Sequence, residues 1–182
     1  MSLMGVAVTL IAAGLILNLI LTTGLVRRLR DFSARGEPEP QLRLPVAPGL
    51  SPGDAVPEFS TTSVAGHSVS TADLNGVPWV VGFFSSGCRA CREHIVDYGD
   101  YVASLRSGST AAIAVVVGTD PGGRDLVETA QHITELLVVE DLGGAVSRSF
   151  AVEAFPSFFA VDRSGRVSHA DLSARRLPQG LS

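Results

Sequence analysis

The chain of 182 residues is long enough for one domain of ordinary size plus an appendage, and 46% of its residues are hydrophobic, so it can fill a core. A net charge of −4 gives no basic field of the kind that phosphate binding requires, which excludes nucleic acid as a partner. All 14 Lys and Arg residues are arginines. The absence of lysine excludes Schiff-base catalysis and the lysine-containing phosphate-binding loop.

The beginning of the chain has the composition of a membrane span. No residue before Arg27 is charged, and Asn18 is the one strongly polar interruption of a long apolar run. At about 1.5 Å per residue, such a helix spans the roughly 30 Å hydrocarbon core of a bilayer. A cleaved signal peptide would have a basic start and a small-residue cleavage site, which this run lacks. We therefore expect residues 1–30 to form a single transmembrane anchor.

Residues 31–57 differ from what precedes and follows them. They are rich in proline, glycine and charged side chains and show no sustained periodicity. A segment of this composition has little apolar surface to bury, so we expect it to remain extended as a linker. The folded domain is then expected over residues 58–182.

In the remaining chain, apolar runs typical of strands alternate with amphipathic runs typical of helices. Residues 77–84 and 111–117 are continuously apolar, as expected of strands covered on both faces. Apolar side chains three and four positions apart predict a helix at 92–105. Similar patterns predict a helix at 124–133, a strand at 136–139, a short helix at 144–150, and a hairpin of strands at 157–162 and 166–172. This order predicts an α/β fold with a mixed sheet flanked by helices.

The two cysteines of the chain, Cys88 and Cys91, stand where the first strand leads into the first helix. Unpaired N–H groups and the helix dipole favour negative charge at a helix N-terminus, so this position stabilises a thiolate at Cys88. Cys91 lies one turn further on, within reach of Cys88 and better buried. We expect Cys88 to attack a partner's disulfide and Cys91 to resolve the mixed disulfide. A purely structural bridge is disfavoured, because so short a loop removes little entropy from the unfolded chain.

A metal site is the alternative use of these thiols, because Cys88, Cys91 and His94 follow one another at intervals of three. Structural zinc usually takes four ligands from two separate places, and the chain has no second cysteine pair. Only three other histidines could complete a set: His67, His132 and His169. We therefore expect neither a metal nor another cofactor. His94 is interpreted as an exposed helix residue, with proton acceptor as the less favoured interpretation.

Two stretches together carry a family resemblance: GDAVPEFSTTSVAGHSVSTADLNGVPWVVGFFSSGCRACREHI and, further on, FPSFFAVDRSGRV. They resemble the thioredoxin-like redoxins, and in particular the membrane-anchored TlpA-like thiol:disulfide oxidoreductases and the related methylamine-utilisation accessory proteins. The resemblance covers about residues 50–172. It implies a thioredoxin-like fold preceded by a single transmembrane helix.

The resemblance also implies roles for particular residues. Cys88 would be the nucleophile, Cys91 the resolving thiol, and Pro156 a cis proline that faces the disulfide. Phe155 would present its backbone to the substrate. The implied partners are protein thiols and disulfides, together with an unidentified electron-donor protein.

Around these residues the sequence departs from the family's pattern. Gly87 replaces the usual Trp before the first cysteine, and Val96 replaces a proline that kinks the helix. The strand before the motif offers no carboxylate to take the proton of Cys91, so its proton acceptor is unidentified. After Leu172 the chain is too short and polar for the closing helix that is usual in the fold.

Two other functions compete with disulfide exchange. Thiol peroxidases of the peroxiredoxin-related superfamily carry a Pro and a Thr seven and three residues before the reactive cysteine, where this chain has Val81 and Ser85. That difference disfavours a peroxidase. The other competitor is a non-catalytic maturation or metal-handling partner, which would use the fold only as a docking surface.

The location of the domain is predicted differently by charge and by resemblance. The arginines that follow the expected anchor favour a cytoplasmic domain by the positive-inside rule. The family implies a domain outside the cytoplasmic membrane, where disulfides persist. We expect an extracytoplasmic domain on a single-pass anchor, because the charge bias is a tendency with known exceptions.

Overall fold

The computed structural model describes residues 13, 49–105, 110–118 and 123–181. The expected anchor, apart from Ala13, and the expected linker up to residue 48 lie outside the described residues. Within the part of the chain that is described, no helix is both long and apolar enough to cross a bilayer. All the elements below belong to the compact unit Pro45–Ser182.

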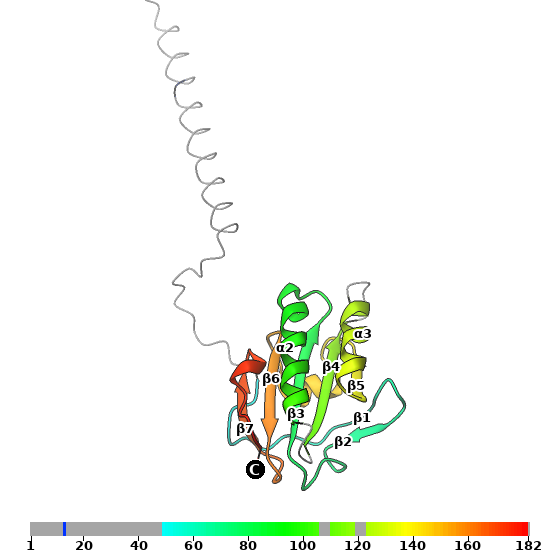
Figure 1. The fold of residues 1–182 in the computed structure, drawn as a ribbon, viewed down its shortest axis with the longest axis vertical. Coiled ribbons are helices and arrows are strands. Elements are labelled where there is room, and N and C mark those ends of the chain that lie inside the picture. Colours follow the sequence, from blue (N-terminus) through cyan, green and yellow to red (C-terminus); the bar gives the residue numbers. More distant parts are fainter. Residues whose placement is uncertain (1–12, 14–48, 106–109, 119–122, 182) are drawn as a thin grey trace, which may run out of the picture. The chain divides into compact units, whose positions relative to one another are not determined.

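A five-stranded mixed sheet with the strand order β5-β4-β3-β6-β7 forms the centre of this unit (Figure 1). Its strands are β3 (Trp79–Ser85), β4 (Ala111–Val117), β5 (Leu136–Glu140), β6 (Ser157–Val161) and β7 (Val167–Asp171). The first three are parallel to one another, and the β6–β7 hairpin adds to β3 in antiparallel fashion. The central strands β3 and β6 are almost continuously buried, which explains their uninterrupted apolar sequences.

Helices cover both faces of the sheet. On one face, α2 (Arg89–Leu105) and α3 (Gly123–Ile133) lie side by side in front of the strands in Figure 1. The other face is covered by α4 (Ala145–Ser149) and by a small sheet of β1 (Ser60–Thr62) and β2 (Ser68–Ser70). The predicted mixed sheet flanked by helices is therefore confirmed.

Alternate residues of β3 fill two separate cores, as the period of a strand requires. Val80 and Phe84 belong to the core beneath α2 and α3. Val81 and Phe83 belong to the core on the opposite face. Aromatic rings join β3 to β6 in both cores, through contacts such as Phe84–Phe158 and Phe83–Phe159. These two neighbouring strands carry the candidate site, and packing on both faces fixes their relative position.

The residues before the first strand are part of the fold. We expected a linker up to residue 57, but Leu50 donates its N–H to the carbonyl of Phe150 at 3.0 Å. Gly53 likewise donates to the carbonyl of Val167 at 2.7 Å. This stretch is held by backbone hydrogen bonds, which any residue can form. Its place in the fold therefore leaves no apolar periodicity in the sequence. The folded unit thus begins before residue 58.

The end of the chain packs on α2 without forming an α-helix. It contains a short 3₁₀ helix, η1 (Ala174–Arg176), and the side chains of Ala174 and Leu177 are buried in the core beneath α2. The hydroxyl of Tyr101 donates to the carbonyl of Pro178 at 2.8 Å. Within the described residues this segment contains no α-helix, and its buried side chains complete the core beneath α2.

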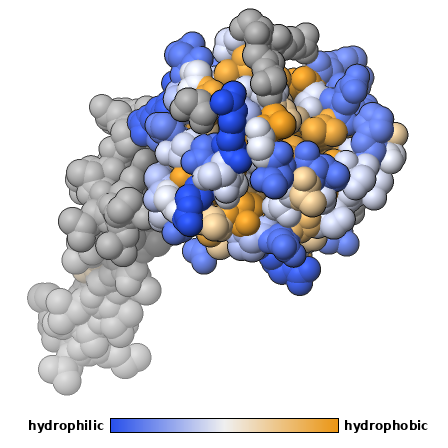
Figure 2. Space-filling model, turned by 90° about the horizontal axis from the view of Figure 1, so that it is seen from below, coloured by the Kyte–Doolittle hydropathy of each residue, from blue (hydrophilic) through white to orange (hydrophobic). Residues whose placement is uncertain are grey.

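The surface seen from below mixes polar and apolar groups. Figure 2 shows apolar residues as small separate areas between hydrophilic side chains rather than as one continuous face. Scattered apolar surface of this kind is ordinary on a folded domain. This face therefore offers no reason to place the functional site on it.

Candidate active site

The two cysteines lie at the edge of the sheet where β3 and β4 end and α2 and α3 begin, the upper edge in Figure 1. Strand β6 starts at this same edge, because it is antiparallel to β3 and Ser157 pairs with Phe83. The turn that leads into α2 and the peptide Phe155–Pro156 therefore meet. The structure thus brings together all four residues that the sequence singled out: Cys88, Cys91, Phe155 and Pro156.

A tight turn positions Cys88 at the start of α2. Its N–H donates to the carbonyl of Ser85 at 3.0 Å, and Ser86 continues the sheet by donating to the carbonyl of Val117 at 3.0 Å. The Cys88 side chain is partly exposed. Next to it, a side chain at Gly87 would meet no atom within 4 Å. The missing aromatic residue at this position leaves the approach to Cys88 open.

The sulfur of Cys88 has two contacts that suit its two protonation states. The N–H of Cys91 is shared between this sulfur and the carbonyl of Cys88, and its nitrogen lies 3.2 Å from each. In the protonated form, the thiol donates to the carbonyl oxygen of Phe155 at 3.5 Å. The Phe155–Pro156 peptide bond is cis, as the resemblance implied.

No acidic residue lies in the first turn of α2, and the arginines of that turn, Arg89 and Arg92, are exposed. The charged side chains of this first turn are therefore both basic.

Cys91 has a different environment from Cys88. Its side chain is fully buried, at 0% exposure, and its sulfur accepts the N–H of Ser85 at 3.4 Å. Both cysteines are free thiols. Burial first, and then the hydrogen bond with Cys88, raise the pKa of Cys91 to about 12. Cys91 therefore keeps its proton at neutral pH and needs a proton acceptor before it can attack.

His94 departs from the interpretation of it as an exposed helix residue. Its side chain is 30% exposed, and its ring lies 6.3 Å from that of Phe158, centre to centre. Its Nδ1 atom is buried without a hydrogen-bond partner, 3.8 Å from Oδ2 of Asp97. In the sequence, His94 was singled out by its spacing of three residues from Cys91. The partial burial of His94 depends on its contact with Phe158 of β6.

The metal alternative finds no cluster to support it in the described part of the chain. There, no three His, Cys, Asp or Glu side chains come together to hold a metal ion. The three histidines that could have completed a set, His67, His132 and His169, are all exposed.

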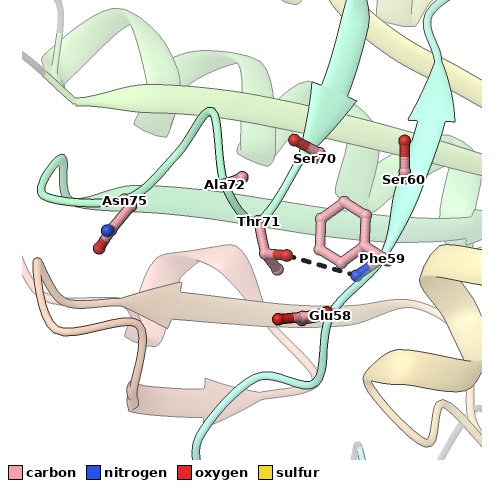
Figure 3. A pocket seen from close by; sticks show the side chains of 7 residues that line it. All are labelled: Glu58, Phe59, Ser60, Ser70, Thr71, Ala72 and Asn75. Carbon is pink, nitrogen blue, oxygen red and sulfur yellow. Dashed lines mark hydrogen bonds between the residues drawn. The ribbon is translucent and has the colours of Figure 1, made fainter.

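A hollow away from the cysteines lies beside the small β1–β2 sheet (Figure 3). Seven residues line it: Glu58, Phe59, Ser60, Ser70, Thr71, Ala72 and Asn75. The hydroxyl of Thr71 accepts the N–H of Phe59 at 3.4 Å, which ties the two sides of the hollow together. None of the lining residues comes from the turn before α2 or from the cis peptide. We therefore place the candidate site at the two cysteines and the cis peptide rather than at this hollow.

The family is shown by a match over most of the folded unit. Residues 52–170 match the model of the AhpC/TSA family. This chain belongs to the AhpC/TSA family. The predicted membership of the redoxins is thereby confirmed, whereas the narrower TlpA-like likeness stays a prediction.

The curated relatives that the chain matches are thiol-disulfide oxidoreductases. The chain is 22% identical over 116 residues to the thiol-disulfide oxidoreductase ResA of Bacillus thuringiensis subsp. konkukian, an overlap of 63% of this chain and 66% of ResA. ResA of Bacillus cereus matches equally, with 22% identity over 116 residues.

Solved structures show the same fold. A Chlorobium tepidum structure assigned as thiol:disulfide interchange protein DsbE has 25% identity and a TM-score of 0.54, covering 66% of this chain and 84% of that one. A DsbF homologue from Corynebacterium diphtheriae has 18% identity and a TM-score of 0.57, covering 76% and 89% respectively. The predicted thioredoxin-like fold is confirmed.

The positions that disfavoured a peroxidase have other tasks in the structure. The Val81 side chain lies in the core on the face of the sheet opposite to that of Cys88 and Cys91. The backbone N–H of Ser85 is bonded to the sulfur of Cys91. Val81 thus does not line a pocket beside Cys88 of the kind that the peroxidase pattern would require.

Proposed function

We propose that this chain is a thiol:disulfide oxidoreductase that exchanges disulfides with partner proteins, with Cys88 as nucleophile and Cys91 as resolving thiol. One observation carries the proposal: a partly exposed sulfur at the start of α2 accepts the N–H of a fully buried cysteine one turn away. The names of the relatives, thiol-disulfide oxidoreductase and thiol:disulfide interchange protein, support it.

In the first step, the Cys88 thiolate attacks one sulfur of a partner's disulfide. A bond forms between Cys88 and that sulfur, the partner's S–S bond breaks, and the other partner sulfur leaves as a thiolate that takes up a proton. Phe155 and Pro156 lie beside the attacking sulfur. They are the surface along which we expect the partner's chain to be held.

In the second step, Cys91 loses its proton and attacks the sulfur of Cys88. The mixed disulfide breaks, the partner leaves with its second sulfur reduced, and Cys88 and Cys91 become a disulfide. Two electrons have passed to the partner. An electron-donor protein would return the pair to thiols by the same steps in reverse.

We further propose that residues 1–30 anchor the chain in the cytoplasmic membrane as a single pass, with the redox domain outside. The uncharged run before Arg27 supports an anchor, and the persistence of disulfides outside the cytoplasm supports the location. A reporter enzyme that is active only after export, fused behind Ser182, tests this orientation. An inactive fusion, paired with an active cytoplasmic reporter at the same point, would place the domain inside.

The exchange itself is tested with the reduced protein and a peptide disulfide. The Cys91→Ser variant should accumulate a mixed disulfide with the peptide at Cys88, detectable by mass spectrometry, while Cys88→Ser forms none. Hydrogen peroxide should be consumed only at the rate of an ordinary thiol. Rapid peroxide consumption, or undiminished turnover by Cys91→Ser, would overturn the proposal.

A further inference from the structure

The second step of the exchange requires a proton acceptor, because the buried Cys91 thiol has to lose its proton. No residue has yet been assigned to this role. With a pKa raised to about 12, only a very small fraction of Cys91 is thiolate at neutral pH. The buried side chains with polar groups in the described residues include the serines Ser63, Ser86, Ser147 and Ser157. Burial raises the pKa of the buried tyrosines Tyr98 and Tyr101, so they keep their protons, and none of these side chains accepts a proton at neutral pH. A proton acceptor therefore has to be a titratable group that lies partly at the surface and still reaches the turn of α2 that contains Cys91.

His94 lies in the right place on the helix. Residues three apart are neighbours on a helix surface, with Cβ atoms about 5–6 Å from each other. The spacing of three therefore puts His94 on the same face of α2 as Cys91, one turn further along the helix. On its other side the imidazole rests against Phe158, two residues beyond Pro156. The ring is thus held between the two elements that build the site.

The ring has an unused polar atom and a charged neighbour. Nδ1 of His94 is buried without a hydrogen-bond partner, and Oδ2 of Asp97 lies 3.8 Å away. The other carboxylate oxygen of Asp97 accepts a hydrogen bond from Arg175 at 2.7 Å. This arrangement leaves one carboxylate oxygen free to stabilise a protonated imidazole. With 30% of its side chain exposed, His94 can also exchange its proton with solvent.

Charged groups around His94 come from more than one element. Asp97 lies on α2 itself, and Arg175 reaches Asp97 from η1. On β7, Asp171 is the register partner of Phe158 and forms an ion pair with Arg176 at 3.6 Å. Each arginine is therefore paired with a carboxylate, which reduces the repulsion that a charged imidazole would meet.

We propose that His94 is the proton acceptor for Cys91 in the second step of the exchange, taking the thiol proton directly or through one water molecule. This inference rests on the proposed function. The proton moves from the Cys91 sulfur to the imidazole while that sulfur bonds to Cys88, the mixed disulfide breaks, and the partner sulfur leaves as a thiolate. The imidazolium, paired with Asp97, then gives its proton to solvent.

An aromatic disulfide that releases a coloured thiolate at each step separates the two reactions in a rapid-mixing experiment. In His94→Asn, the first release, by Cys88, should be preserved. The second release, by Cys91, should slow by about 100-fold, the lower range of what general base catalysis contributes. The matched control is His132→Asn, which replaces an exposed histidine on α3. It should show both phases at the wild-type rates.

Two further readouts distinguish proton transfer from a packing role against Phe158. Without an internal acceptor, the second phase should rise about tenfold per pH unit, because it follows the thiolate fraction of Cys91. Added imidazole should restore part of the lost rate. The His94→Gln variant repeats both measurements with a larger side chain, in case the shorter one disturbs the fold.

The outcomes separate this inference from the function on which it rests. A wild-type second phase in both His94 variants would overturn the role of His94, as would a slowed phase with neither the steeper pH dependence nor rescue by imidazole. If the wild-type protein itself releases no second thiolate, the proposed exchange fails first.

Discussion

The sulfur of Cys88 lies 3.5 Å from the carbonyl oxygen of Phe155, although 67 residues separate them in the chain. The two meet because β3 and β6 are neighbours and Phe83 pairs with Ser157 at their shared edge. One side of the site is a thiol at a helix start, and the other is a stretch of backbone beside it. The pairing of β3 and β6 thus brings a short motif against backbone from a distant part of the chain.

The two thiols should react very differently with an alkylating reagent. At neutral pH we expect iodoacetamide to modify Cys88 at least roughly 100 times faster than Cys91, because Cys91 is fully buried and protonated. Peptide mass spectrometry over a time course measures both rates in one sample. In urea, where the fold is lost, the two rates should converge. Equal rates in the folded protein would contradict the assigned roles.

The fold should lose stability in alkali. The pKa of Cys91 is raised from 9.0 to about 12, and that of Tyr101 from 10.0 to about 12, in both cases mainly by burial. The unfolded chain releases these protons at lower pH than the folded one, so the stabilisation is complete below about pH 9 and is lost progressively toward pH 12. Urea unfolding near pH 7 and near pH 10.5 measures the decline in the free energy of unfolding.

Tyr101→Phe is the informative variant for this alkaline effect. It removes one titrating group and the hydrogen bond to Pro178, so it should be less stable by about 1 kcal/mol at neutral pH. Its free energy of unfolding should nevertheless fall less steeply with rising pH. A decline as steep as that of the wild type would show that Tyr101 does not titrate as expected.

The C-terminal segment should contribute measurably to stability. Leu177→Ala should lower the free energy of unfolding by about 2–4 kcal/mol, because Leu177 is 4% exposed in the core beneath α2. Leu142→Ala is the matched control, since Leu142 is 83% exposed and its truncation should change stability by less than about 0.5 kcal/mol. Similar effects of the two substitutions, measured by urea unfolding, would mean that the segment is not held on α2.

The end of α4 offers a stabilising substitution. Ala151 has a φ of +49°, a left-handed conformation in which an alanine is strained and a glycine is not. Ala151→Gly should therefore raise the free energy of unfolding by about 0.5–1 kcal/mol. The exposed Ala103, inside α2, provides the opposite control, because Ala103→Gly should cost about 1 kcal/mol. A loss of stability at both positions would contradict the assigned backbone strain.

The sequence predicted the elements that bury continuous or periodic apolar runs. Strand β3, helix α2 and the hairpin around Gly165 appear within a few residues of their expected positions. The placement of Cys88 and Cys91 followed from the same reasoning, because a strand that leads into a helix presents the helix N-terminus at the sheet edge. Their difference in burial was predicted from the extra helical turn.

Other features depend on contacts that no local pattern records. Strands β1 and β2 have three residues each, mostly Ser and Thr, too short for an alternating pattern to emerge. The approach of Phe155 to Cys88 came from the resemblance, since nothing in their spacing of 67 residues indicates contact. His94 was misjudged as exposed because its cover, Phe158, belongs to a strand more than 60 residues away.

The turn that contains Cys88 follows β3, and the Phe155–Pro156 peptide directly precedes β6. Because these two strands are neighbours, the inter-strand spacing of about 4.8 Å determines how close the Cys88 sulfur and this peptide come. Extra residues in the loop between β5 and α4 would leave the pairing of Phe83 with Ser157 unchanged. One residue inserted within β6 would turn each of its side chains to the other face and carry Phe155 away from the thiol. Tolerance to chain-length changes around this site is thus set by strand register rather than by distance along the sequence.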